Sequence, residues 1–389
     1  MATKRSLSLL LILSLLMATT SLSTDIYLPA MPTMEKMLQG NAELTITGFL
    51  IGFSLAQLFW GPISDRIGRK WPLFIGVSLF IVGSIGCAMS QTMHEIVFWR
   101  VFQAFGACVG PMLSRAMIRD LFSRSQAAQM LSTLTIIMAI APIAGPFIGG
   151  GLLKISSWHA NFWLLAGIGV IMLLSLFRLP ETLPPKKRAQ GSIWGAFGDY
   201  AKLLKNRNFM LYTLCVTFFY VSNYAFITAS PFIYLDYFHV PSEYFGFLFG
   251  INVLGIVALS ALNRKIVQKI ALSRVLRATT QIAWLSALIL GLVSYFNIGG
   301  LFGIVLPMFA IFSMTGVVAA CATAAALNEV NDEMAGSAAA LLGSLQYGSG
   351  VISSLLLSLF QNDSPWTMAW IIVLFVSLSA LMARLSREK

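Results

Sequence analysis

Charged residues are scarce in this chain of 389 residues: Asp, Glu, Lys and Arg make up 11% of it, whereas 57% is hydrophobic. An ordinary soluble domain carries about 25% charged residues. So few charges cannot keep so much apolar surface in water, so the composition excludes a soluble protein. Acidic residues are the scarcer sign, 15 against 26 Lys and Arg, which gives a net charge of +11.

Cysteine and histidine are also rare, with 4 and 3 residues. Cys87, Cys108, Cys215 and Cys321 are far apart in sequence, as are the histidines, so no metal-ligand spacing is present. A phosphate-binding loop of the G-x-x-x-x-G-K-[ST] type is absent as well. These absences predict no metal site, no cofactor and no direct use of ATP, and they argue against an enzyme.

Apolar residues form runs long enough to cross a bilayer, whose hydrocarbon core of about 30 Å requires about 20 residues of helix. We expect an all-α membrane protein with twelve transmembrane helices. The predicted runs are residues 6–28, 44–63, 72–91, 95–118, 126–151, 161–179, 210–235, 243–263, 272–296, 299–327, 335–360 and 365–384. The first run also resembles a secretory signal, but it is longer than the apolar core of about 7–15 residues in such a signal.

The basic residues indicate how the chain crosses the bilayer. Cytoplasmic loops of membrane proteins accumulate Lys and Arg. With the N-terminus placed in the cytoplasm, the outer loops carry only Lys36 and Lys154, and Arg100 alone falls within a span away from its cytoplasmic end. Both termini are therefore predicted to be cytoplasmic. The positive charge is then a sign of topology and not of nucleic-acid binding.

One long internal connection divides the chain. It begins near Arg178, is rich in proline and then turns basic. Proline cannot continue a helix interior, so the sixth helix ends there. We predict a six-helix bundle over residues 1–179, a cytoplasmic linker over 180–209 and a second six-helix bundle over 210–389.

A short charged turn joins the second and third runs, with the sequence Gly61-Pro62-Ile63-Ser64-Asp65-Arg66-Ile67-Gly68-Arg69-Lys70. Its basic residues hold the turn on the cytoplasmic side. The two glycines would let helices approach closely. The pattern G-x-x-x-D-R-x-G-R-K resembles the loop between helices 2 and 3 of the major facilitator superfamily.

Three further segments resemble the same superfamily. Residues 100–106, Arg-Val-Phe-Gln-Ala-Phe-Gly, resemble its R-x-x-Q-G-x-G motif of helix 4, with Ala104 where the motif has glycine. Residues 145–150, Gly-Pro-Phe-Ile-Gly-Gly, are similar to the helix 5 motif of drug/proton antiporters. Residues 24–30, Thr-Asp-Ile-Tyr-Leu-Pro-Ala, resemble the end of helix 1 in the Bcr/CflA-like drug efflux branch.

This resemblance covers nearly the whole chain and implies a function. It implies proton-coupled efflux of small aromatic drugs, of the multidrug or amphenicol type, by alternating access in a bacterial inner (cytoplasmic) membrane. The partners would be drug, protons and the lipid bilayer, with the protein a monomer driven by the proton gradient. Two alternatives stay open: a proton-coupled symporter for a small nutrient, and a non-transporting membrane receptor on the same scaffold.

Ionisable residues at membrane depth are functional candidates because they are costly there. Asp25 precedes Pro29, at the outer end of the first run, by one helical turn, and Arg100 follows Glu95 by a similar distance. Both therefore lie at similar depth. We predict that Asp25 carries the proton and Arg100 is its counter-charge. The alternative is that Asp25 caps a helix end or pairs with Arg100 as a static brace.

Polar and aromatic side chains at membrane depth are candidate contacts for cargo, because rings and hydrogen-bonding groups suit varied aromatic drugs. Packing and helix-to-helix hydrogen bonds are the alternative role for each of them. The predicted substrate-binding residues are Tyr27, Ser54, Gln57, Gln103, Tyr220, Asn223, Tyr224, Asn252 and Gln346.

Two further sets are assigned to conformational change. A charged set at the cytoplasmic end would lock the two halves and release them. It comprises Asp65, Arg66, Arg69, Asp120 and Arg124. A helix-breaking set in the fifth run would act as a hinge, or would serve close helix packing. It comprises Pro142, Gly145, Pro146, Gly149 and Gly150.

Overall fold

The computed structural model of the chain describes residues 2–122, 124–188, 194–331, 334–360 and 364–386. Every regular element in these residues is a helix. Among them, 11 helical segments are long and apolar enough to cross a membrane, and Ile140–Ile155 is a shorter apolar helix. An all-helical architecture with many membrane-spanning helices is thus confirmed. The count of twelve spans and the cytoplasmic termini stay predictions.

The chain divides into two compact units, Met1–Gly195 and Ala196–Lys389. The boundary between them lies within the proline-rich and basic connection of residues 180–209.

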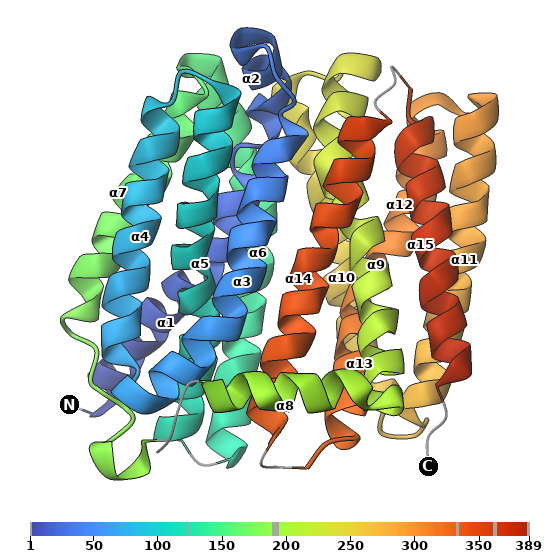
Figure 1. The fold of residues 1–389 in the computed structure, drawn as a ribbon. Helices are drawn as coiled ribbons and strands as arrows, with labels where there is room; N and C mark the ends of the chain where they lie inside the picture. The colour runs from blue at the N-terminus through green and yellow to red at the C-terminus, as the bar shows by residue number, and fades with distance from the viewer. Residues whose placement is uncertain (1, 123, 189–193, 332–333, 361–363, 387–389) are drawn as a thin grey trace. The chain divides into compact units, whose positions relative to one another are not determined.

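Helices of the first unit run side by side (Figure 1). They are α1 (Ala2–Asp25), α2 (Met31–Leu38), α3 (Glu43–Ile67), α4 (Lys70–Met89), α5 (Met93–Leu121), α6 (Arg124–Ile155) and α7 (His159–Leu176), with 3-10 turns η1 (Leu28–Ala30) and η2 (Pro185–Lys187). Helix α5 packs on α1, α3 and α4. This packing places the middle of α5 in the interior of the unit.

The second unit repeats the side-by-side arrangement. Its helices are α8 (Trp194–Lys205), α9 (Arg207–Pro231), α10 (Ser242–Ile266), α11 (Leu272–Phe296), α12 (Gly300–Ser313), α13 (Thr315–Asn328), α14 (Ala335–Leu359) and α15 (Trp366–Leu385), with a π-helical turn η3 (Phe232–Tyr237). Helix α8 runs crosswise to α9 (Figure 1). Helix α9 packs on α13, α14 and α15. The predicted run 299–327 is two helices, α12 and α13, which meet at Met314.

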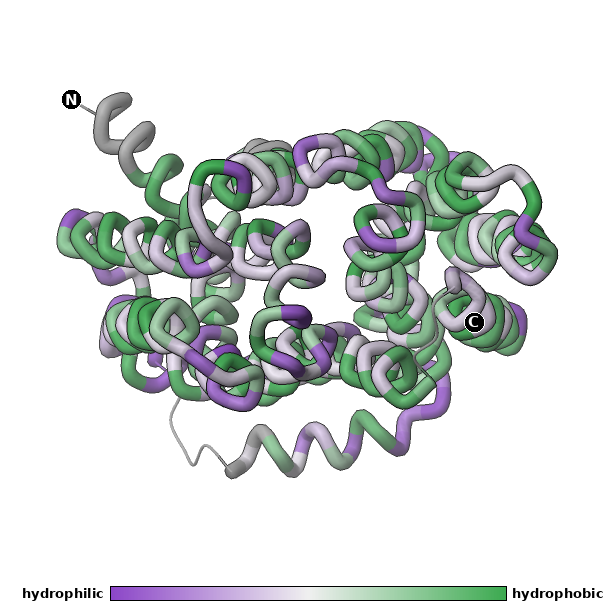
Figure 2. The backbone as a smooth tube through the Cα atoms, turned by 90° about the horizontal axis from the view of Figure 1, so that it is seen from above, coloured by the Kyte–Doolittle hydropathy of each residue, from purple (hydrophilic) through white to green (hydrophobic). Residues whose placement is uncertain are grey.

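Large apolar side chains are exposed along the helix faces, among them Trp71, Phe302 and Leu306 at 67%, 71% and 65%. Hydrophilic residues are frequent at the turns, and α8 mixes hydrophilic with hydrophobic residues (Figure 2). Such faces would be unfavourable in water, whereas lipid chains cover them without cost. The pattern fits helices that stand in a bilayer.

Candidate functional site

Arg100 of α5 is fully buried and links three helices of the first unit. Its Nη1 donates hydrogen bonds to the carbonyl oxygen of Ser23 (2.8 Å) and to Oε1 of Gln103 (2.6 Å). Its Nε donates to the carbonyl oxygen of Thr45 (3.4 Å), and Nη2 donates to the hydroxyl of Tyr27 (3.3 Å). These bonds tie α5 to α3 and to the end of α1, as the predicted equal depth requires.

Neutral groups surround the Arg100 charge. Its guanidinium carbon lies 4.5 Å and 4.3 Å from the ring centroids of Tyr27 and Phe49, and cation–π contacts of this kind are favourable away from water. Asp25, the last residue of α1, is also buried, and its Oδ1 accepts a hydrogen bond from Thr24 (2.9 Å). Within the described part of the chain, Asp25 and Arg100 form no ion pair. Their proposed roles in proton coupling stay predictions.

A second buried acid begins α3. Glu43 is 5% exposed, and its Oε2 has no hydrogen-bond partner among the described residues. Two residues later on the same helix, the Thr45 hydroxyl is hydrogen-bonded to the hydroxyl of Tyr27 (2.9 Å). Sequence analysis misses Glu43 because the predicted run starts one residue after it.

Two of the predicted cargo contacts, Tyr27 and Gln103, are hydrogen-bonded to Arg100. We call these three residues the Arg100 cluster. Tyr27 and Gln103 are both fully buried. Gln103 accepts a hydrogen bond from Arg100 and donates one through Nε2 to Ser84 (2.8 Å), so both of its polar ends bond to protein. Ser54 and Gln57 lie about two to three turns after Thr45 on α3, so they are outside this cluster, and both are half-buried.

Asn223 of α9 and Asn252 of α10 are buried amides, 2% and 1% exposed. Oδ1 of Asn223 accepts a hydrogen bond from the Thr315 hydroxyl of α13 (3.2 Å), and Nδ2 of Asn252 donates to the carbonyl oxygen of Leu248 (3.0 Å). The other amide atoms, Nδ2 of Asn223 and Oδ1 of Asn252, have no hydrogen-bond partner in the residues described. An unpaired buried polar atom costs about 1–3 kcal/mol.

Tyrosines gather where α9 meets α14. The ring centroid of Tyr220 lies 6.2 Å from that of Tyr224 and 6.3 Å from that of Tyr347. Gln346 precedes Tyr347 on α14 and is half-buried. Three predicted cargo contacts, Tyr220, Tyr224 and Gln346, therefore belong to one region of the second unit.

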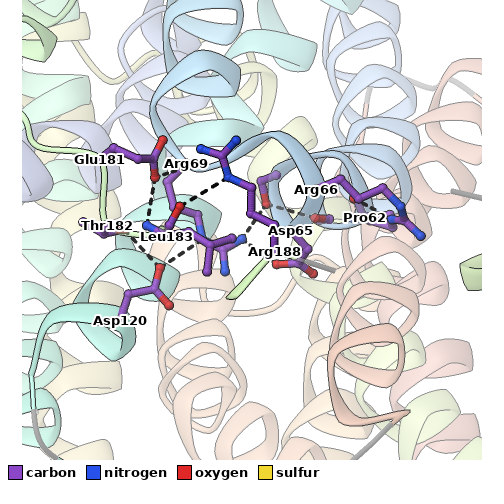
Figure 3. Close-up of polar contacts among 11 residues, drawn as sticks. Pro62, Asp65, Arg66, Arg69, Asp120, Glu181, Thr182, Leu183 and Arg188 are labelled. Carbon is purple, nitrogen blue, oxygen red and sulfur yellow. Dashed lines mark hydrogen bonds and ion pairs between the residues drawn. The ribbon is translucent and has the colours of Figure 1, made fainter. Parts of the chain in front are cut away.

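Arg69 holds the charged turn between α3 and α4 (Figure 3). Its Nη1 lies 2.5 Å from Oδ1 of Asp65 and donates to Oγ of Ser64 (2.8 Å), and its Nε lies 3.1 Å from Oδ2 of Asp120. Burial alone would lower the pKa of Arg69, but the hydrogen bonds and charges of Asp65 and Asp120 raise it. The structure thus brings Asp65, Arg69 and Asp120 together within the first unit; their role as a gate stays a prediction.

Glu181, four residues before η2, caps the helix that follows this turn (Figure 3). Its Oε1 accepts hydrogen bonds from the backbone N–H groups of Arg69 and Leu183, both at 2.9 Å, and its Oε2 accepts from that of Lys70 (3.1 Å). The N–H groups of Arg69 and Lys70 are otherwise unpaired donors at the N-terminus of α4. Burial alone would raise the pKa of Glu181, but the backbone hydrogen bonds lower it.

Thr182 adds a second tie between the connection and the turn, because its hydroxyl donates to Oδ2 of Asp120 (3.0 Å) (Figure 3). Sequence analysis misses Glu181 and Thr182 because their partners are distant in sequence. One signal was available: Glu181 is the single acid in the basic stretch of residues 178–191.

The predictions for the remaining residues of the turn compare differently with the structure. Gly68 has a φ of +99°, which favours glycine, and an added Cβ there would lie 2.5 Å from Oε2 of Glu181. At Gly61 an added Cβ would meet no atom of the described residues within 4 Å, so no close approach is seen there within the first unit. Arg66 donates to a backbone carbonyl one turn earlier (2.7 Å). The Arg124 side chain lies outside the described residues.

Glycines of α6 pack against the end of α1. An added Cβ at Gly149 would overlap the carbonyl oxygen of Ile26, and one at Gly145 would lie 3.2 Å from Cβ of Asp25. The other members of the predicted hinge, in the same helix, are Pro142, Pro146 and Gly150. Close packing explains Gly149 and Gly145, while hinge motion stays a prediction.

Comparison with known proteins matches residues 13–354 to the Major Facilitator Superfamily. A Bacillus subtilis protein called "Uncharacterized MFS-type transporter YdgK" is 35% identical, over 93% of this chain and 91% of its own length. The "Bicyclomycin resistance protein homolog" of Haemophilus influenzae is 28% identical, over 97% of this chain and 96% of its own. The solved xylose transporter XylE from E. coli has the same fold, with a TM-score of 0.76, 14% identity and 98% coverage of both chains.

Proposed function

The chain belongs to the Major Facilitator Superfamily, and from this premise we propose that it exports small aromatic drugs in exchange for protons. We place it as a monomer in the bacterial inner membrane, working by alternating access. The relative named for bicyclomycin resistance supports a drug as cargo, because the similarity spans nearly all of both chains. The long apolar helices support a multi-pass membrane location.

The observation that carries the proton coupling is the burial of Asp25 within a membrane-spanning segment. Carboxyl groups in such positions mark proton relays in many pumps and transporters. Asp25 also adjoins the segment that Arg100 holds, since Arg100 bonds the carbonyl oxygen of Ser23, two residues earlier. A proton gained or lost at Asp25 would change the charge beside this cluster.

Antiport then requires only that cargo and proton disfavour each other. If protonation of Asp25 weakens drug binding by some factor, drug binding weakens protonation by the same factor. A proton that enters from outside would release the drug there, and departure of the proton inside would restore drug binding. Typical coupling free energies correspond to factors of about 5–150.

The test is Asp25→Asn, which keeps the shape of the side chain and removes its titration. We expect proteoliposomes with this variant to lose pH-driven drug movement, because the coupling between drug binding and protonation, typically a factor of about 5–150 in affinity, is removed. Drug exchange without a gradient should persist. Glu43→Gln is the matched control, because it neutralises the other buried acid described above, and it should keep pH-driven transport.

The outcomes separate the competing functions. Full pH-driven efflux by Asp25→Asn would remove Asp25 as the coupling acid, and a loss confined to Glu43→Gln would move that role to Glu43. Drug movement down the proton gradient, in the same direction as the protons, would identify a symporter. Ligand binding without movement in the unaltered protein would identify a receptor.

A further inference from the structure

Phenylalanines from three helices form a buried ring layer in the second unit. Phe226 of α9 stacks on Phe249 of α10, with centroids 6.0 Å and planes 5° apart. Phe312 of α12 meets these two rings edge-on at 5.3 Å and 6.2 Å. In η3, which continues from α9, the ring of Tyr234 lies 6.1 Å from that of Phe245, which precedes Phe249 on α10. Helices α9 and α10 therefore run in opposite directions.

A polar layer lies one helical turn from these rings. Asn223 precedes Phe226 by three residues on α9, and Asn252 follows Phe249 by three residues on α10. Because the helices are antiparallel, both steps lead the same way along the bundle. Thr315, which follows Phe312 by three residues, donates a hydrogen bond to Asn223. This bond independently places Asn223 one turn from the ring layer. The two amides thus occupy one level of the unit.

The free atoms of these amides are complementary. Nδ2 of Asn223 is a donor and Oδ1 of Asn252 is an acceptor, and neither has a protein hydrogen-bond partner among the described residues. Asn263, farther along α10 and also buried (6% exposed), differs, because its amide contacts Sγ of Cys321 at 3.7–3.8 Å. Leaving a donor and an acceptor unpaired at one level is costly, which indicates that something bonds to them.

The second unit offers no charge to a bound group at this level. Residues 208–235, 244–263, 278–328, 335–360 and 365–383, which form the apolar parts of its helices, contain no Asp, Glu, Lys, Arg or His. A cation or anion placed at Asn223 and Asn252 would therefore lose its hydration with no opposite charge from these helices to compensate. An uncharged group with hydrogen-bonding atoms loses far less.

We propose that Asn223 and Asn252 bind an uncharged group of the cargo that both accepts and donates a hydrogen bond. A carboxamide or hydroxyl group has this chemistry: its oxygen accepts from Nδ2 of Asn223, and its N–H or O–H donates to Oδ1 of Asn252. The ring layer one turn away packs on the aromatic part of the molecule. The assignment rests on the proposed export function and narrows the cargo to neutral aromatic amides or alcohols.

The test compares two probes in proteoliposomes with an imposed pH gradient. Chloramphenicol is an uncharged aromatic compound with amide and hydroxyl groups, and ethidium is an aromatic cation. We expect Asn223→Leu and Asn252→Leu each to raise the KM for chloramphenicol about tenfold, the effect of one well-placed hydrogen bond. The double variant should lose less than the product of the two losses, because both amides bond one group. Asn263→Leu, the same change at a paired amide, should leave the KM unaltered.

Asn223→Asp keeps the test open if the leucine variants fold poorly, because it preserves the side-chain shape. It should weaken chloramphenicol transport and admit ethidium. Unchanged chloramphenicol KM values in the asparagine variants would overturn the inference and leave a buried water as the partner of the amides. Transport of ethidium alone by the unaltered protein would also overturn it while drug export stands. Movement of neither probe would overturn both the inference and the proposed export.

Discussion

At the scale of the residue, Arg100 is a buried charge that forms no ion pair among the described residues. Removing an ion from water costs several kcal/mol in a protein. Hydrogen bonds that involve a charged group recover about 1.5–3 kcal/mol each, and Arg100 makes four of them to neutral acceptors. The rings of Tyr27 and Phe49 add to this. Arg100 can therefore stay charged whether or not Asp25 carries a proton, which is what a coupling acid requires of its neighbour.

Glu181 offers a test of the cap on α4. We predict that Glu181→Gln lowers the free energy of unfolding by about 0.5–1 kcal/mol, because a helix cap is lost but the side chain is partly exposed. Thermal unfolding in detergent measures the change. Asp199→Asn is the matched control, since Asp199 pairs with the exposed Lys202 (3.1 Å), and it should leave stability nearly unchanged.

The same variant has a defined pH dependence. Because the pKa of Glu181 is lowered in the folded protein, its stabilisation is present above the ordinary glutamate pKa of about 4.3. That stabilisation is lost as the pH falls through the folded-state pKa. The difference between Glu181→Gln and the unaltered protein should shrink on acidification from neutral pH. A difference that grows on acidification would contradict the cap.

At the scale of the element, α6 packs closely against the end of α1 because Gly149 has no side chain. Gly149→Ala would push a methyl group into the carbonyl oxygen of Ile26. We predict a loss of about 1–3 kcal/mol, the usual cost of overpacking. Gly151→Ala, two residues on in the same helix, meets open space and should stabilise by about 0.5–1 kcal/mol, because alanine favours helix. Thermal unfolding of both variants measures the two changes in the free energy of unfolding, which should have opposite signs. Equal changes would show that α6 is not closely packed against α1 at Gly149.

Hydropathy and charge predict the elements well, because crossing a bilayer demands long apolar runs and basic cytoplasmic loops. Breaks inside a span are harder to predict: Ser313, Thr315 and Gly316 around Met314 are less apolar than the residues on either side, but the run as a whole stays apolar, and α12 ends and α13 begins there. The site was predictable where partners are near in sequence or share a motif, as with Asp65 and Arg69. Glu181 was not, because its partners in the turn lie more than a hundred residues earlier and only folding brings them together.

At the scale of the whole molecule, chemistry is divided between the two units. Among the described residues, the buried acidic and basic side chains at membrane depth are Asp25, Glu43 and Arg100 of the first unit, whereas the second unit has buried amides and rings there. In the proposed cycle the first unit would handle the proton and the second would bind the neutral cargo. Coupling between the proton site and the cargo site needs two conformations of the molecule that differ in their affinity for both ligands. The cluster of Asp65, Arg69 and Asp120 is our candidate for the contact that forms in one conformation and breaks in the other.

Asp65 and Asp120 allow this role to be separated from stability. Both pair with Arg69, but the Asp65 side chain is 53% exposed and that of Asp120 is 18% exposed. An exposed pair contributes at most about 1 kcal/mol, whereas loss of the more buried carboxylate should cost about 1–3 kcal/mol. We predict that Asp120→Asn lowers thermal stability more than Asp65→Asn does.

A role of this cluster as a gate would show in turnover. Asp65→Asn should slow kcat for drug transport in proteoliposomes and leave drug affinity unchanged, because the carboxylate lies in the charged turn and outside the proposed cargo site. Normal turnover in Asp65→Asn would reduce the cluster to a structural tie within the first unit.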